Sequence, residues 1–188
     1  MRNVLLIATG GTIAGRAASA ARTQGYEPGA LPVAALIDSV PGLAALANVS
    51  AEQPFSIGSQ HIGSTHWLAL VRRVRAALAD DAIDGIVITH GTDTLEETAF
   101  VLDLACPRDK PVVLTGAMRP ATSIGADGPM NLHGAVALAA HPSARGLGAV
   151  VLMNDLVLAP HRAAKGHSTR IDAFGARDAA PQIGRAHV

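Results

Sequence analysis

The chain alternates short apolar runs with longer segments of helical period, and this alternation restricts the possible folds more than any other feature. The apolar runs lie at 4–8, 83–89, 111–114 and 149–153. Helical period is clearest in 65–79, where apolar residues recur every three or four positions. Runs rich in Val, Ile and Leu are typical of strands that are buried on both faces. The alternation predicts an α/β fold: a mostly parallel, doubly wound sheet, Rossmann-like or flavodoxin-like, with helices on both faces.

Three further segments are predicted to be helices, at 32–46, 95–106 and 129–140. A break at Pro41-Gly42 divides the first of them. Thr94 and Glu97 have the spacing of a capping box before the second, and Asp127 is placed to cap the third. The helices therefore fall between the apolar runs, as a doubly wound sheet requires.

The last part of the chain has a different character. Asn154-Asp155 predicts a tight turn into 156–159, which would form a hairpin with the preceding apolar run. From Gly175 onward, glycine, proline and polar residues follow one another without a period. We therefore predict one domain over residues 1–174 and a partial linker or tail over residues 175–188.

Charge and cysteine content exclude several classes of protein. The 15 basic and 15 acidic residues balance, which leaves no electrostatic footprint for nucleic acid or an anionic membrane. No run approaches the roughly 18 apolar residues of a membrane span, and the run after Arg2 is too short for a signal peptide. Cys106 is the single cysteine, so it forms neither an internal disulfide nor a thiolate zinc site. We expect a cytoplasmic protein, or a periplasmic one if a leader was removed.

Small and polar residues follow three of the predicted strands. The three segments are Thr9-Gly10-Gly11-Thr12, His90-Gly91-Thr92-Asp93-Thr94 and Thr115-Gly116-Ala117-Met118-Arg119. Ligands of parallel sheets bind beyond the carboxyl ends of the strands, so these segments are expected to meet in one crevice. Their glycines permit sharp turns and close approach of a ligand to the backbone. The pattern predicts a small-molecule site at this edge of the sheet.

Missing motifs narrow the chemistry of that site. HExxH, GxSxG, the Walker pattern and GxGxxG are all absent, which disfavours zinc hydrolases, serine hydrolases and nucleotide binding. A threonine needs a base or a bonded partner to act as a nucleophile, and Lys165 is a candidate base. Other interpretations stay open at this level: Thr12 as a turn residue, Thr92 to Thr94 as a helix cap, Lys165 as a surface lysine and Ser59-Gln60 as an ordinary loop pair.

Six segments taken together resemble the bacterial L-asparaginases. They are TGGTIAG at 9–15, IGSQ at 57–60, ITHGTDTLEETAF at 88–100, LTGAMRP at 114–120, DGPMNL at 127–132 and KGHSTRIDAF at 165–174. They occur in the family's order, and the first and third at this separation are highly specific. The resemblance implies hydrolysis of the side-chain amide of L-asparagine to L-aspartate and ammonia, without a metal or organic cofactor.

The resemblance also implies catalytic roles for five residues. Thr12 matches the nucleophilic threonine of the family, and Tyr26 matches its activating neighbour. Thr92, Asp93 and Lys165 match a second catalytic group, which is arranged like a Ser-His-Asp triad with lysine as the base.

Substrate binding is implied for a partly overlapping set: Gly11, Ser59, Gln60, Thr92, Asp93 and Ala117. Ser59, Gln60 and Asp93 match the positions that hold the α-carboxylate and α-ammonium of the substrate. The backbone near Gly11 and Thr12, together with the Thr92 N–H, is expected to bind the oxyanion.

Family members continue through a linker into a second, smaller α/β domain that donates an acidic residue to the site of a neighbouring subunit. The resemblance therefore implies that this chain is the larger N-terminal domain, that it is strongly impaired alone, and that it belongs to a homo-oligomer. Three alternatives stay open. They are a relaxed glutaminase-asparaginase that also accepts L-glutamine, a non-catalytic amino-acid-binding domain, and a tRNA-dependent amidotransferase subunit, which the early first strand disfavours.

Overall fold

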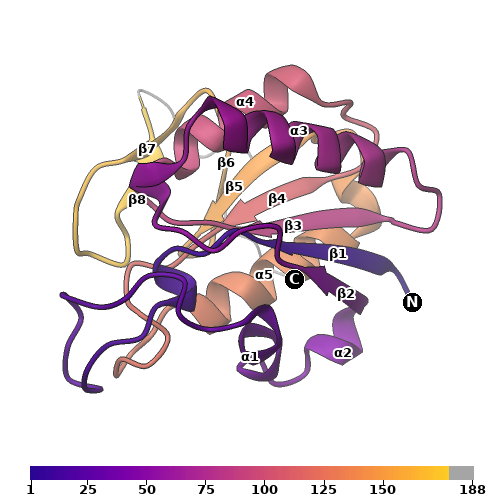
Figure 1. Ribbon diagram of the computed structural model, residues 1–188. Coiled ribbons are helices and arrows are strands. Elements are labelled where there is room, and N and C mark those ends of the chain that lie inside the picture. Colours follow the sequence, from indigo (N-terminus) through magenta and orange to yellow (C-terminus); the bar gives the residue numbers. More distant parts are fainter. Residues whose placement is uncertain (178–188) are drawn as a thin grey trace.

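A six-stranded sheet with the order β2-β1-β3-β4-β5-β6 forms the centre of the computed structural model, which describes residues 1–177 (Figure 1). The parallel strands are β1 (Asn3–Ala8), β2 (Asn48–Glu52), β3 (Gly85–Thr89), β4 (Val112–Thr115) and β5 (Ala149–Met153). Strand β6 (Leu156–Leu158) is antiparallel to β5. The order 2-1-3-4-5 is that of flavodoxin-like sheets, so the predicted fold class is confirmed.

Helices cover both faces of this sheet (Figure 1). One face carries α3 (Ser64–Leu78) and α4 (Leu95–Ala105), and the other carries α1 (Val33–Asp38), α2 (Leu43–Leu46) and α5 (Gly128–Ala140). Alternate residues of β1 belong to the two cores: Leu5 and Ile7 to the first, Val4 and Leu6 to the second. Burial on both faces explains the continuous apolar runs of the sequence. Three short 3₁₀ helices are also found in residues 1–177: η1 (Thr12–Ala14), η2 (Ser59–His61) and η3 (Pro142–Ala144).

Three strands were not predicted. The edge strand β2 has the sequence NVSAE and is only partly buried, so it lacks the apolar run that marks the central strands. Strands β7 (Ala163–Lys165) and β8 (Phe174–Ala176) form a separate hairpin whose short length leaves no period to read. Strand β8 extends past the predicted start of the tail at residue 175, and residues 178–188 of that tail lie outside the described residues.

The predicted capping box at the start of α4 is wrong. The Thr94 hydroxyl donates to the carbonyl oxygen of Ser59 at 2.9 Å and makes no bond to its own helix, because a tertiary partner is available. Asp127 precedes α5 as predicted, but its carboxylate accepts from the N–H groups of Met118 and Arg119 at 2.9 Å each. Both side chains therefore fix loops at the sheet edge in place of helix ends.

The predicted turn at Asn154-Asp155 is confirmed. Both residues have a positive φ, 48° and 63°, which is the conformation of a two-residue hairpin turn between β5 and β6. Within residues 1–177, no helix combines the length and the apolar character that crossing a bilayer requires.

Candidate functional site

A pocket of about 220 Å³ lies beyond the carboxyl ends of β1 and β3. Strand order reverses between these two strands, and this switch point is where open parallel sheets bind ligands. The pocket brings together most of the predicted site residues: Gly11, Thr12, Tyr26, Ser59, Gln60, Thr92 and Asp93. Three further lining residues had no individual role predicted: Pro28, Gly58 and Gly91, of which Gly91 lies in a segment expected at this crevice.

Thr12 and Tyr26 are bonded to each other in this pocket. The hydroxyl oxygens lie 2.5 Å apart, and either one can be the donor. Thr12 is 6% exposed and begins η1 directly after the two glycines that follow β1. A buried hydroxyl with a phenol as its partner has the local arrangement that an activated nucleophile needs.

Lys165 connects the β7–β8 hairpin to Thr92 and Asp93. Its Nζ donates to Thr92 Oγ1 at 2.8 Å and to Asp93 Oδ1 at 2.6 Å. Its backbone N–H donates to the Glu96 carboxylate at 2.5 Å, which fixes β7 against α4. The alternative of an unattached surface lysine is thereby excluded. No spacing in the sequence indicates this contact of Glu96 with the backbone of Lys165.

Ser59 joins η2 to the loop after β3. Its buried hydroxyl oxygen accepts from the Asp93 N–H at 3.1 Å, while its own hydrogen is left to bind another acceptor. Gln60 is exposed beside it, and both residues line the pocket. Donors of this kind suit a carboxylate that enters from solvent.

The expected oxyanion contact of Gly11 is not supported, because its N–H already donates to the carbonyl oxygen of Ile57 at 3.0 Å. None of the hydrogen bonds found within residues 1–177 uses the N–H of Thr12 or of Thr92. The N–H groups of Thr12 and Thr92 are therefore the better candidates for an oxyanion.

Ala117 is separated from the other predicted residues. It is completely buried behind the end of β4 and does not line the pocket. Its implied contact with the substrate stays a prediction.

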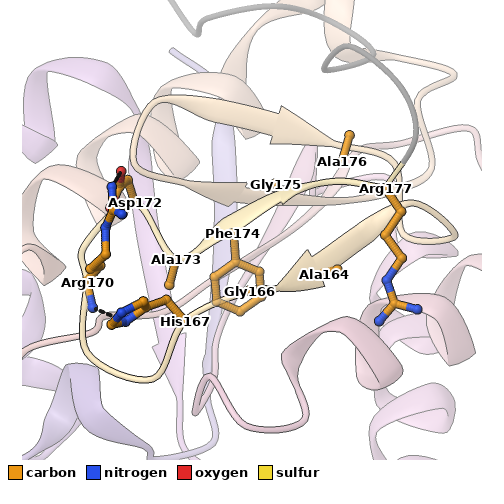
Figure 2. A pocket seen from close by; sticks show the side chains of 10 residues that line it. All are labelled: Ala164, Gly166, His167, Arg170, Asp172, Ala173, Phe174, Gly175, Ala176 and Arg177. Carbon is orange, nitrogen blue, oxygen red and sulfur yellow. Dashed lines mark hydrogen bonds and ion pairs between the residues drawn. The ribbon is translucent and has the colours of Figure 1, made fainter.

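A second hollow, of about 380 Å³, lies along the β7–β8 hairpin (Figure 2). Its described lining contains no hydroxyl side chain, and its exposed Arg170 and Asp172 are paired with each other at 2.5 Å. Side chains alternate along a strand, so Lys165 points away from Ala164, which lines this hollow. Within residues 1–177, no three His, Cys, Asp or Glu side chains are grouped to hold a metal ion. The pocket at β1 and β3 is therefore the candidate active site.

His90 was given no role of its own, although its segment, residues 90–94, was expected at the crevice. It is completely buried, and its Nδ1 lies 2.7 Å from the Gly91 carbonyl oxygen, so this nitrogen carries the hydrogen. Its Nε2 then accepts from the Thr98 hydroxyl at 3.0 Å, and that hydroxyl accepts from Trp67 Nε1 at 2.9 Å. Burial lowers the pKa of His90 to about 4. This chain of bonds holds a neutral imidazole behind the pocket.

Acidification is expected to destabilise the protein through His90. The native pKa of about 4 lies below the usual 6.5, so the unfolded chain binds the proton first. The contribution of His90 to the free energy of unfolding is fully present above pH 6.5, the pKa of histidine in the unfolded chain. It is lost as the pH drops from 6.5 toward 4, by on the order of 3 kcal/mol. Urea unfolding of the wild type and of His90→Gln across this pH range measures the loss. The free energy of unfolding of the variant should fall less steeply with pH than that of the wild type.

A second measurement covers the case in which His90→Gln does not fold. In the native wild type, the ring resonances of His90 should not titrate above a pH of about 5. Titration near the ordinary histidine value would contradict the predicted contribution.

Comparison with known proteins places this chain in a family. A sequence model described as "Asparaginase, N-terminal" matches residues 3–187. L-asparaginase 2 of Bacillus subtilis is 47% identical over 92% of this chain and 46% of its own length. The glutaminase-asparaginase of Pseudomonas aeruginosa is 47% identical over 93% of this chain and 48% of its own length.

A solved structure gives the same result for the fold. The crystal structure of a probable cytoplasmic L-asparaginase from Campylobacter jejuni superimposes with a TM-score of 0.91 and 45% identity, over 94% of this chain and 54% of that one. The chain spans about half the length of the curated relatives that it matches. From the family match over nearly all residues and the identity of almost half of them, the chain belongs to the asparaginase family and matches its N-terminal domain.

Proposed function

We propose that this site hydrolyses the side-chain amide of L-asparagine to L-aspartate and ammonia, with Thr12 as the nucleophile. The observation that carries the proposal is the bonded pair of Thr12 and Tyr26 in a pocket that also holds Thr92, itself bonded to Lys165. Relatives that are named L-asparaginases support the reaction class.

The first chemical step forms an ester. Thr12 Oγ1 attacks the amide carbon, and the carbonyl electron pair moves to oxygen, where the N–H groups of Thr12 and Thr92 are available to bind it. The C–N bond then breaks. The hydrogen of the Thr12 hydroxyl passes through the Tyr26 oxygen to the leaving nitrogen, which departs as ammonia.

The second step consumes water. With Lys165 as the base, its nitrogen takes the hydroxyl proton of Thr92, whose Oγ1 lies 2.8 Å away, and Thr92 Oγ1 takes a proton from the attacking water. Water oxygen bonds to the ester carbon and the bond to Thr12 breaks, while the proton that Lys165 gained passes through the site to Thr12 Oγ1, so that Lys165 and Thr92 regain their starting states. The products are L-aspartate and the original enzyme.

Substrate orientation is assigned to Asp93, Ser59 and Gln60. One oxygen of Asp93 is bonded to Lys165, and no bond found within residues 1–177 uses Oδ2 of Asp93, so this oxygen suits the α-ammonium of the substrate. The Ser59 hydroxyl and the Gln60 amide suit the α-carboxylate without adding a cation.

L-Glutamine is the second candidate substrate, because relatives of equal identity are named glutaminase-asparaginases. The two substrates differ by one methylene, which a pocket discriminates by only about 1–3 kcal/mol. The measured ratio of kcat/KM for the two amino acids decides between them.

The experiment is ammonia release from L-asparagine and L-glutamine by the 188-residue chain, alone and mixed with the C-terminal half of a relative. Turnover by the chain alone or by the mixture supports the reaction class. Activity that needs the added half supports two implications of the resemblance, that the chain alone is impaired and that the second domain of a neighbouring subunit completes the site. Activity of the chain alone contradicts the first of them. Binding of L-aspartate without turnover, both by the chain alone and by the mixture, would favour a non-catalytic binding domain. Cytoplasmic location and homo-oligomer formation stay predictions.

A further inference from the structure

The loop from Gly15 to Pro28 determines whether Tyr26 can reach Thr12. Residues 18–25 of this loop are all exposed, so no core contact holds its outer part. Its base is closed by two backbone bonds between Arg16 and Glu27, each 3.0 Å long. The outer part therefore depends on whatever lies beside it.

Residues 119–127, which belong to the loop between β4 and α5, lie beside this first loop (Figure 1). Four hydrogen bonds join residues 15–22 of the first loop to residues 121–124 of the second. They are Ala121 N–H to Gly15 O at 3.1 Å, Ala17 N–H to Thr122 Oγ1 at 2.8 Å, Ile124 N–H to Ala20 O at 2.8 Å, and the Ser123 hydroxyl to Arg22 O. Two of them use the side chains of Thr122 and Ser123, and Ser123 is only 7% exposed although it lies on a loop.

The second loop is itself fixed to the sheet. Asp127 accepts from the backbone of Met118 and Arg119, and the Arg119 guanidinium donates to Gly125 O at 3.0 Å. Asn131 on α5 donates to Asp127 at 3.3 Å and to Gly116 O, just after β4, at 3.0 Å. The loop 119–127 is thus a rigid support for the loop that carries Tyr26.

We infer that Thr122 and Ser123 are positioning residues of the reaction: they act through the loop to hold the Tyr26 hydroxyl on Thr12. The inference rests on the proposed function, because holding Tyr26 on Thr12 affects the reaction only if Thr12 is the nucleophile. Misplacement of a reacting group by about 1 Å commonly costs around a hundredfold in rate, so loss of either side-chain bond should lower kcat.

The test uses the single tyrosine of the sequence as a reporter. Ring-¹³C tyrosine gives one set of NMR signals, all from Tyr26, in the 188-residue chain. Thr122→Val and Ser123→Ala should each shift these signals toward those of the urea-unfolded chain, while Thr122→Ser should restore the native position. Ser39→Ala is the matched control, because it removes a similar serine-to-carbonyl bond, to Leu36 O at 2.7 Å, on α1 and away from both loops.

Activity is measured in parallel on whichever preparation turns over. A fall of roughly tenfold in kcat with KM nearly unchanged is expected for the two variants and not for Ser39→Ala. Native Tyr26 signals in both Thr122→Val and Ser123→Ala would overturn the inference, whatever the activity. Shifted signals in the variants, together with a wild type that hydrolyses neither amino acid alone or with the added C-terminal half, would support the positioning and contradict the proposed function.

Discussion

Replacing Thr12 by valine is expected to lower ammonia release from L-asparagine by on the order of 10⁴-fold or more, because loss of a nucleophile removes the covalent route altogether. Valine keeps the branched shape of the side chain and removes only the hydroxyl that lies 2.5 Å from the Tyr26 oxygen. The melting temperature should change little, since the remaining side chain still fills the same buried position.

The measurement is steady-state ammonia release by Thr12→Val, Thr12→Ser, Thr92→Val and Thr65→Val. Thr65 is an exposed threonine on α3 and serves as the matched control. Serine should retain part of the activity because it keeps the hydroxyl. Full activity of Thr12→Val, with loss in Thr92→Val, would move the role of nucleophile to Thr92.

The central architecture was predictable because burial leaves a direct mark on sequence. Strands β1 and β5 are covered on both faces, so their residues are apolar without interruption, and their predicted positions agree closely with the observed ones. Strand β2 lies at the edge and carries Asn, Ser and Glu, so its pairing with β1 depends on backbone bonds that no side-chain pattern reports.

The site was predictable as a location and less so as a set of contacts. Strand ends in parallel sheets converge, which was enough to place Thr12 and Thr92 in one pocket. Lys165 and its partner Thr92 are 73 residues apart along the chain, and their proximity was implied by the family resemblance. The Thr94 hydroxyl donates to Ser59 and not to its own helix, because tertiary acceptors compete with local ones. The Gly11 N–H likewise donates to Ile57.

Substituting alanine for Gly11 is expected to be the most damaging change to stability, by on the order of 3–5 kcal/mol. Gly11 has φ 79° and ψ −170°, a region that is essentially closed to other residues. A Cβ there would lie 2.3 Å from the Gly91 Cα and 2.4 Å from the Gly91 nitrogen. These are backbone atoms on a loop fixed by β3, so they cannot move aside as a flexible side chain would.

Gly42→Ala is the control for a Cβ added at positive φ without a clash, because Gly42 has φ 80° and ψ 3°, in the αL region, and no atom lies within 4 Å of the added Cβ. Thermal unfolding should show a drop for Gly11→Ala several times that of Gly42→Ala, for which about 1 kcal/mol is expected. Equal drops would contradict both causes, the closed backbone region of Gly11 and its approach to Gly91. A larger drop for Gly11 would agree with two reasons for a glycine after β1: the backbone there has a conformation closed to other residues, and without a Cβ the loops after β1 and β3 come into contact, so that Thr12 and Thr92 line the same pocket.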